Sequence, residues 1–120
     1  MSHPEADANQ GPFQRDAIVL VTLNSPREKF WGAVLAISGA GLSIRGIDLN
    51  SFEDFIRQVK AGEQVMAHTV FFPLHRVERI ELDARDGDIP SLQERFINKA
   101  GIRFTEMVAG QGLSSSERGE

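Results

Sequence analysis

The sequence predicts a mainly β domain in which five strongly bent antiparallel strands form a small barrel, accompanied by two short helices. Residues 30–49 hold two apolar runs joined by Ser38-Gly39-Ala40-Gly41, which is the pattern of a β-hairpin. Three further stretches, residues 17–23, 64–72 and 77–82, are rich in strand-forming residues. Helical spacing is confined to two short segments. Five short, bent strands in one chain favour a partly open barrel.

Composition limits the domain count and the chemistry. A chain of 120 residues suggests a single domain, and its formal charge of −4, from 13 basic and 17 acidic residues, provides no global attraction for nucleic acid or an anionic membrane. A local basic patch remains compatible with this balance. Cysteine is absent, which excludes disulfides, thiol catalysis and cysteine-ligated metal.

The two ends of the chain differ from its middle. Residues 1–12 and 110–120 are polar and rich in glycine, proline or serine, so we expect a disordered arm and a disordered tail around a single domain at 13–109. Residues 1–12 lack the basic start and apolar run of a secretory signal, and no apolar run is long enough to span a bilayer. We therefore expect a cytoplasmic protein with no membrane partner.

The strand predicted first, residues 17–23, is followed by a polar turn around Pro26 and then by the hairpin. Residues 30–37 are apolar at nearly every position, so both faces of this strand should be covered, or the strand should bend sharply. Trp31 lies within this run and is expected in the core. In the second run the apolar residues shift from even-numbered to odd-numbered positions. Leu42 and Ile44 precede this change of parity, and Ile47 and Leu49 follow it. The change at Arg45-Gly46 predicts a bulge or strong bend.

A helix is predicted directly after the hairpin, between the third and fourth strands. Asn50 is a suitable N-cap with Glu53 as its capping-box partner, and Gly62 should end the helix. Its apolar residues share one face: Phe52, Phe55, Ile56 and Val59. A helix this short requires docking on the barrel or on a partner chain.

The remaining chain predicts two strands and a second helix. Residues 73–76 are too few for a wide loop, so the strands at 64–72 and 77–82 should meet in a tight corner of 3₁₀ type. The second helix should begin at Ser91, with a capping box to Glu94, and end at Gly101. Its inward residues should be Leu92, Phe96 and Ile97. Residues 102–108 are interpreted as a last extended piece.

No catalytic or metal-binding constellation stands out. The glycine-rich hairpin turn leads into a strand instead of a helix, which argues against a phosphate loop. His68 and His75 are an odd number of residues apart and no carboxylate completes a ligand set. The acidic turn at 83–88 does not match the spacing of a calcium loop and reads as a solvated turn. We therefore predict no enzyme activity, no metal and no cofactor.

Basic residues offer one candidate binding site. Should barrel closure bring the hairpin turn and the 73–76 corner to one end, His75 and Arg76, with Arg45, would form a local positive site able to contact RNA. The alternative is a solvated surface on which Glu78 and Glu81 pair with nearby arginines.

The pattern of residues 17–82 resembles the Sm-like family of small, SH3-like barrels. Residues 71–80, FFPLHRVERI, resemble the corner between that family's last two strands. His75 matches the histidine with which bacterial Sm-like RNA chaperones contact RNA, but Leu74 stands where their lysine would be and Ser38 replaces an acidic residue. The family's N-terminal helix is not evident. The resemblance implies an Sm-like barrel, and rings or sheet-extended oligomers formed through edge strands.

These observations predict a non-enzymatic Sm-like interaction or assembly module that self-associates through edge strands. Residues 64–72 have few charges with which to protect an exposed edge, which fits pairing with another copy. The alternative is an RNA-binding protein that uses the turn end of the barrel, with His75, Arg76 and Arg45 as contacts.

Overall fold

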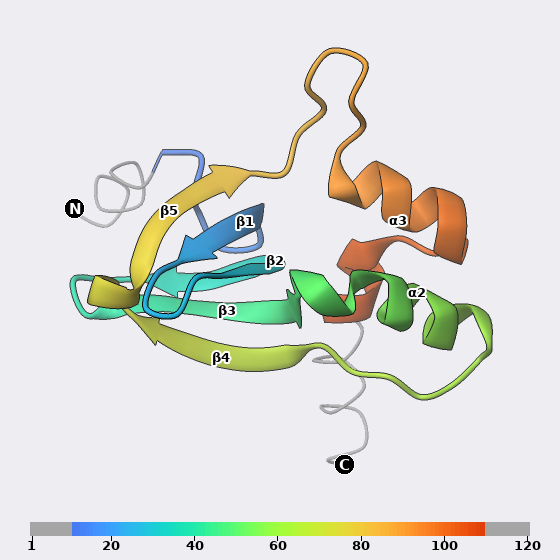
Figure 1. The fold of residues 1–120 in the computed structure, drawn as a ribbon, viewed down its shortest axis with the longest axis horizontal. Coiled ribbons are helices and arrows are strands. Elements are labelled where there is room, and N and C mark those ends of the chain that lie inside the picture. The colour runs from blue at the N-terminus through green and yellow to red at the C-terminus, as the bar shows by residue number, and fades with distance from the viewer. Residues whose placement is uncertain (1–10, 110–120) are drawn as a thin grey trace, which may run out of the picture.

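The computed structural model describes residues 11–109 and contains one five-stranded antiparallel sheet with short helices (Figure 1). The strands are β1 (Ile18–Leu23), β2 (Glu28–Ile37), β3 (Gly41–Asp48), β4 (His68–Pro73) and β5 (Val77–Leu82). Their order in the sheet is β4-β3-β2-β1-β5, so the predicted mainly β fold with five antiparallel strands is confirmed. The sheet is not closed: β4 and β5 are its two edges within the described residues.

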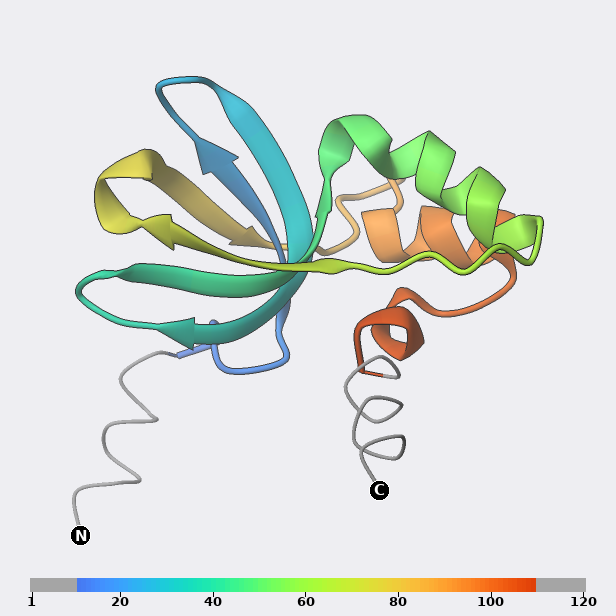
Figure 2. The ribbon, with the colours of Figure 1, turned by 90° about the horizontal axis from the view of Figure 1, so that it is seen from below.

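Both faces of the sheet are buried, as the apolar run at residues 30–37 predicts. One face packs against the helices, through a cluster that includes Trp31, Ala33, Ile47, Phe52, Phe96 and Phe104. The other face encloses a second cluster made by the strands themselves, with Val19, Val21, Leu23, Phe30, Val34, Leu42 and Ile44 at its centre. Figure 2 shows the strands curling around this second core on the side away from the helices. The sheet therefore separates two cores.

The predicted bulge at Arg45-Gly46 is wrong. Pairing between β2 and β3 runs without interruption from Phe30 opposite Asp48 to Val34 opposite Ile44, and the register shifts only between Val34 and Ala36. Because both faces of β3 are apolar, its change of parity marks a change from one core to the other. Gly46 has a different role: a Cβ there would lie 2.0 Å from the Trp31 carbonyl oxygen, so two backbones approach here too closely for a side chain.

The first helix begins later than predicted and with a different cap. A 3₁₀ turn, η1 (Leu49–Ser51), precedes α2 (Phe52–Lys60), and the Asp48 carboxylate accepts a hydrogen bond from the Asn50 N–H at 2.8 Å. Asn50 is therefore not the N-cap and makes no capping box with Glu53. The predicted end holds, because Gly62 adopts φ +77° and its N–H donates to the Val59 carbonyl. Three of the four predicted stripe residues are buried: Phe52, Phe55 and Ile56.

The second helix, α3 (Leu92–Ala100), has the capping box that the sequence predicts. The Ser91 hydroxyl accepts from the Glu94 N–H at 3.0 Å, and the Glu94 carboxylate accepts from the Ser91 N–H at 2.7 Å. Gly101 ends the helix with φ +82°. Phe96 is fully buried, but Ile97, which we expected to face inward, is 38% exposed.

The piece predicted as extended at residues 102–108 is helical, because residues 104–109 form a further helical segment. Phe104 and Val108 are both buried, and their spacing of four residues places them on one helix face. Phe104 stacks on Trp31 with ring centroids 3.6 Å apart. The spacing of these two residues is the signal that predicts a helix here.

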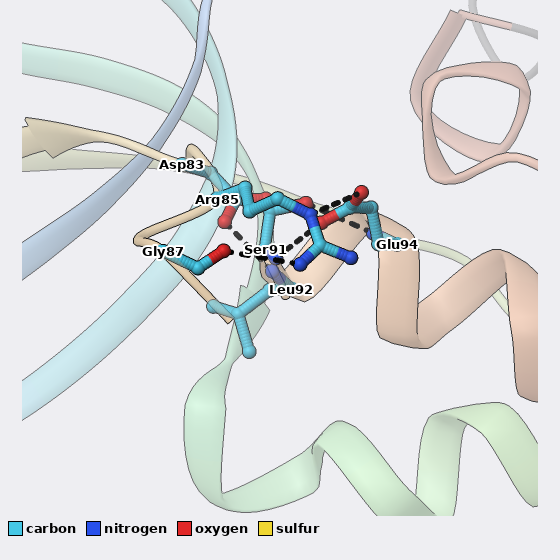
Figure 3. A network of polar contacts seen from close by, with 6 residues as sticks. All are labelled: Asp83, Arg85, Gly87, Ser91, Leu92 and Glu94. Atoms are coloured by element: carbon cyan, nitrogen blue, oxygen red, sulfur yellow. Dashed lines mark hydrogen bonds and ion pairs between the residues drawn. The ribbon is translucent and has the colours of Figure 1, made fainter. Parts of the chain in front are cut away.

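Asp83 connects the end of β5 to the start of α3. Its carboxylate accepts hydrogen bonds from the Leu92 N–H at 2.8 Å, the Gln93 N–H at 2.9 Å and the Trp31 indole N–H at 3.1 Å. Figure 3 shows this carboxylate beside the capping box. The expectation of a solvated acidic turn is therefore wrong for Asp83, which satisfies free donors of the helix N-terminus.

Three remaining predictions concern the edges and ends of the domain. The strand predicted at 64–72 begins only at His68, whereas the corner, η2 (Leu74–Arg76), and β5 lie where expected. The predicted disordered ends fall on residues 1–10 and 110–120, outside the described residues, while Gly11 and Pro12 form a turn. No helix of the described part is both long and apolar enough to cross a membrane.

Candidate functional site

The corner η2 lies between the two hairpin turns at one end of the sheet, and Figures 1 and 2 agree on this arrangement. The Leu74 N–H donates to the Ala40 carbonyl of the β2–β3 turn at 2.9 Å. On the other side, the Asn24 N–H of the β1–β2 turn donates to the Arg76 carbonyl, also at 2.9 Å. The hairpin turn and the corner therefore share one end of the molecule without closure of the sheet. We call this the turn end.

The guanidinium group of Arg76 makes its contacts within the turn end. Its guanidinium donates to the carbonyl oxygens of Asn24 and Pro26, the latter at 2.8 Å, and lies 3.7 Å from the Glu28 carboxylate. Only 19% of the side chain is exposed. These contacts anchor the β1–β2 turn to the corner and leave little of the Arg76 charge for a ligand.

His75 is exposed at the corner, beside Leu74, which is 52% exposed. Arg45 does not join them. It lies four residues from Gly41, about 13 Å along β3, and its guanidinium donates to the Thr69 hydroxyl at 3.0 Å and the Val108 carbonyl at 3.3 Å. The three residues proposed for RNA contact are therefore divided between two places: His75 and Arg76 at the turn end, Arg45 near the C-terminal helical segment.

The other arginines near the corner are paired with carboxylates. Arg27 lies 3.7 Å from Glu78, and Arg79 lies 3.1 Å from Glu81. This is the arrangement of the alternative in which these charges make a solvated surface, and such exposed pairs contribute little to stability.

The two edge strands differ in charge. β4, with the sequence HTVFFP, contains no aspartate, glutamate, lysine or arginine, whereas β5, VERIEL, carries Glu78, Arg79 and Glu81. Charged side chains protect an edge against pairing with another chain, so β5 is the protected edge and β4 the unprotected one.

Large exposed apolar side chains gather along these edges. Four of the six in the described residues lie on β4 or β5, on the corner that joins them, or two residues before β4: Met66, Phe71, Leu74 and Leu82. The other two lie elsewhere, Ile89 in the loop between β5 and α3 and Ile97 on α3. The low charge of β4 can be predicted from the sequence, but this distribution cannot, because exposure depends on which strands end up at the edge.

A groove of about 620 Å³ adjoins the start of β4. Its lining comes from the segment 64–68, from η1 and α2, and from the end of β3. Its ionisable residues are Asp48, Asp54 and His68, and the exposed Met66 also lines it. Among residues 11–109, no group of three or more histidine, aspartate or glutamate side chains is arranged to hold a metal ion.

Comparisons with family models, curated proteins and solved structures find no match for this chain.

Proposed function

We propose that this chain is a non-enzymatic assembly module that self-associates through the edge strands of its sheet. The observation that carries the proposal is the exposure of large apolar side chains on both edge strands and on the corner between them: Phe71, Leu74 and Leu82. Burial of apolar area at such sites favours association, and a strand edge supplies backbone donors and acceptors to pair with.

The proposed fold type is an Sm-like, incompletely closed barrel. Three features support it: the strand order β4-β3-β2-β1-β5, the core enclosed by the curled sheet, and the short 3₁₀ turn that joins the two edge strands. In this fold type the edges are the surfaces through which subunits meet, which agrees with the proposed self-association.

Light scattering coupled to gel filtration tests the proposal. We expect a mass above the 13.3 kDa of one chain, increasing with protein concentration until it reaches a plateau. A constant monomer mass at all accessible concentrations would refute self-association.

RNA contact at the turn end is the second candidate, and the exposure of His75 at the corner favours it. RNA retention on a filter at low salt should decrease in His75→Ala and remain unchanged in His68→Ala, which removes the exposed histidine at the other end of β4. Arg76 is unsuitable for this test because it holds the β1–β2 turn. Equal retention by the wild type and His75→Ala would remove this candidate.

A further inference from the structure

We propose, building on the self-association above, that two copies pair through β4 alone. The two β4 strands would run antiparallel about a two-fold axis at Val70, which continues the sheet from one copy into the other. The partner is thus a second copy of this chain, presenting the same edge.

The hydrogen bonds of the corner determine which backbone groups of β4 face outward. Gly41 lies opposite Pro73, and the Leu74 N–H donates to the Ala40 carbonyl, one residue beyond that pair on each strand. Gly41 and Pro73 are therefore a non-hydrogen-bonded pair, and alternation makes the pairs at 68, 70 and 72 the hydrogen-bonded ones. The N–H and C=O groups of Thr69 and Phe71 consequently point away from β3, toward the free edge.

These outward groups favour one register. With Val70 opposite itself, Thr69 of one copy faces Phe71 of the other, and each such pair exchanges both of its backbone hydrogen bonds. Pro73 has no N–H to donate, so the edge ends there. The same register brings the segment before β4, with Met66, toward the corner of the other copy, with Leu74. Met66 is 65% exposed and Leu74 52%, so pairing would cover the exposed apolar side chains at both ends of β4.

Charge favours pairing of β4 with β4 over pairing of β4 with β5. β5 carries three charged residues, and its arginine and glutamate side chains are already joined, Arg79 to Glu81 within the strand and Glu78 to Arg27 outside it. Pairing on that edge would crowd and desolvate these charges. β4 has no such charges, so pairing with a second β4 requires the least desolvation of charged side chains.

The groove beside β4 gives a second reason. In this register the corner of the second copy, with its exposed His75, approaches the groove that contains Asp48 and Asp54. The Arg76 guanidinium is held by the β1–β2 turn and Asp54 is paired with Arg57, so the contact would join the imidazole of His75 to the Asp48 carboxylate. This pairing of a donor with an acceptor favours the antiparallel arrangement of the two strands.

A single introduced cysteine tests the register, because the chain contains no other thiol. Val70 would form a non-hydrogen-bonded pair with itself, with Cα atoms about 4.5 Å apart, within the range that a disulfide bridges. We expect Val70→Cys to form a reducible covalent dimer under mild oxidation. Ile80→Cys is the matched control, since Ile80 packs on the same core from β5, and it should stay uncrosslinked.

Charge substitution provides a test that needs no crosslink. Phe71→Lys on β4 should convert a species of twice 13.3 kDa into a monomer, whereas Leu82→Lys, at a similarly exposed position on β5, should leave the dimer intact. Circular dichroism on both variants confirms that the fold is retained.

The outcomes distinguish this inference from the proposed function. A wild-type monomer refutes both. A ring or larger oligomer that either lysine variant dissociates supports self-association but overturns the β4–β4 dimer. The same conclusion follows if a crosslink between two chains forms only in the double variant Val70→Cys/Ile80→Cys, because that crosslink joins β4 of one copy to β5 of another. A dimer that Leu82→Lys dissociates and Phe71→Lys does not also overturns it.

Discussion

Asp83 shows how one side chain can join three parts of this molecule. It follows β5, its carboxylate accepts from two backbone N–H groups at the start of α3, and it accepts from the indole of Trp31 on β2. Trp31 is fully buried, and its indole N–H donates to this carboxylate. Buried donors without a partner are costly, which makes Asp83 a structural residue of the domain.

Replacing Asp83 with alanine should lower the free energy of unfolding by roughly 1–3 kcal/mol, the cost of leaving buried donors unsatisfied. Urea denaturation followed by tryptophan fluorescence measures the change, since Trp31 is the single tryptophan. Asp88→Ala, in the same loop but exposed, is the control and should be nearly neutral. Equal effects of the two substitutions would contradict the role assigned to Asp83.

Gly46 is constrained by space. A Cβ at this position would lie 2.0 Å from the Trp31 carbonyl oxygen and 2.5 Å from the Gly32 Cα, and both of these neighbours are backbone atoms that cannot rotate away. Close approach of β2 and β3 at this point therefore requires glycine.

Gly46→Ala should destabilise the domain by at least about 1–3 kcal/mol, the usual cost of overpacking. Thermal unfolding by circular dichroism is the measurement. Gly39→Ala is the matched control because a Cβ at Gly39 has no neighbour within 4 Å. Wild-type stability in Gly46→Ala would show that the two strands can separate freely.

Among the elements, α3 is the one with the most complete N-terminus. The Ser91 N–H donates to the Glu94 carboxylate, and this bond holds the pKa of Glu94 below its ordinary value of 4.5, against the opposing effect of desolvation and with further help from the nearby Arg85. Arg85 lies 3.4 Å from the same carboxylate (Figure 3). The ionised form of Glu94 is therefore favoured by folding.

A depressed pKa in the folded state contributes stability above pH 4.5, and the contribution is lost as pH falls from there through the folded value. Glu94→Gln keeps an acceptor for the Ser91 N–H but does not titrate. Its urea midpoint should lie below that of the wild type at neutral pH, and the difference should shrink as the pH is lowered below 4.5. Glu63→Gln controls for the loss of one negative charge. A difference independent of pH would contradict the linkage.

At the scale of the whole molecule, two cores share one sheet. The helical layer packs on Trp31, Ala33 and Ile47, while Phe30, Val34 and Ile44 of the same two strands belong to the core inside the curl. Because each strand contributes to both cores, loss of one should remove support from the other, and the domain should unfold in a single transition.

Phe104→Ala tests this coupling. It removes the ring stacked on Trp31 and should cost about 3–5 kcal/mol, as do other truncations of buried aromatic residues. The fluorescence of Trp31, within the helix-side core, and the far-ultraviolet signal of the strands should fall together at a lower denaturant concentration. Fluorescence that changes before the strand signal would show that the helical layer unfolds separately.

The proposed assembly also belongs to this scale. β4 and β5 are adjacent in sequence, separated only by η2, yet they lie at opposite edges of the sheet. The short corner η2 therefore joins the two edge strands of the sheet. Because β5 carries charges and β4 does not, β4 is the edge available to a second copy.

The sequence alone determined the local features, because each depends on residues a few positions apart. The capping box of Ser91 and Glu94, the helix ends at Gly62 and Gly101, the 3₁₀ corner and the existence of five strands all follow from short-range hydrogen bonding or alternation. The cap of α2 was misplaced because the helix begins after an extra 3₁₀ turn that Asp48 stabilises.

Only the tertiary structure decided what depends on long-range pairing. The parity change in β3 could mean a bulge or a second core, and only the partners of Ile44 and Ile47 distinguish the two. The separation of Arg45 from His75 and the choice of β4 and β5 as edges follow from sheet order. So does the role of Asp83, whose partners lie up to 52 residues away along the chain. Alternation specifies that a residue faces inward but not which surface meets it, because contacts between distant strands form only when the whole sheet is assembled.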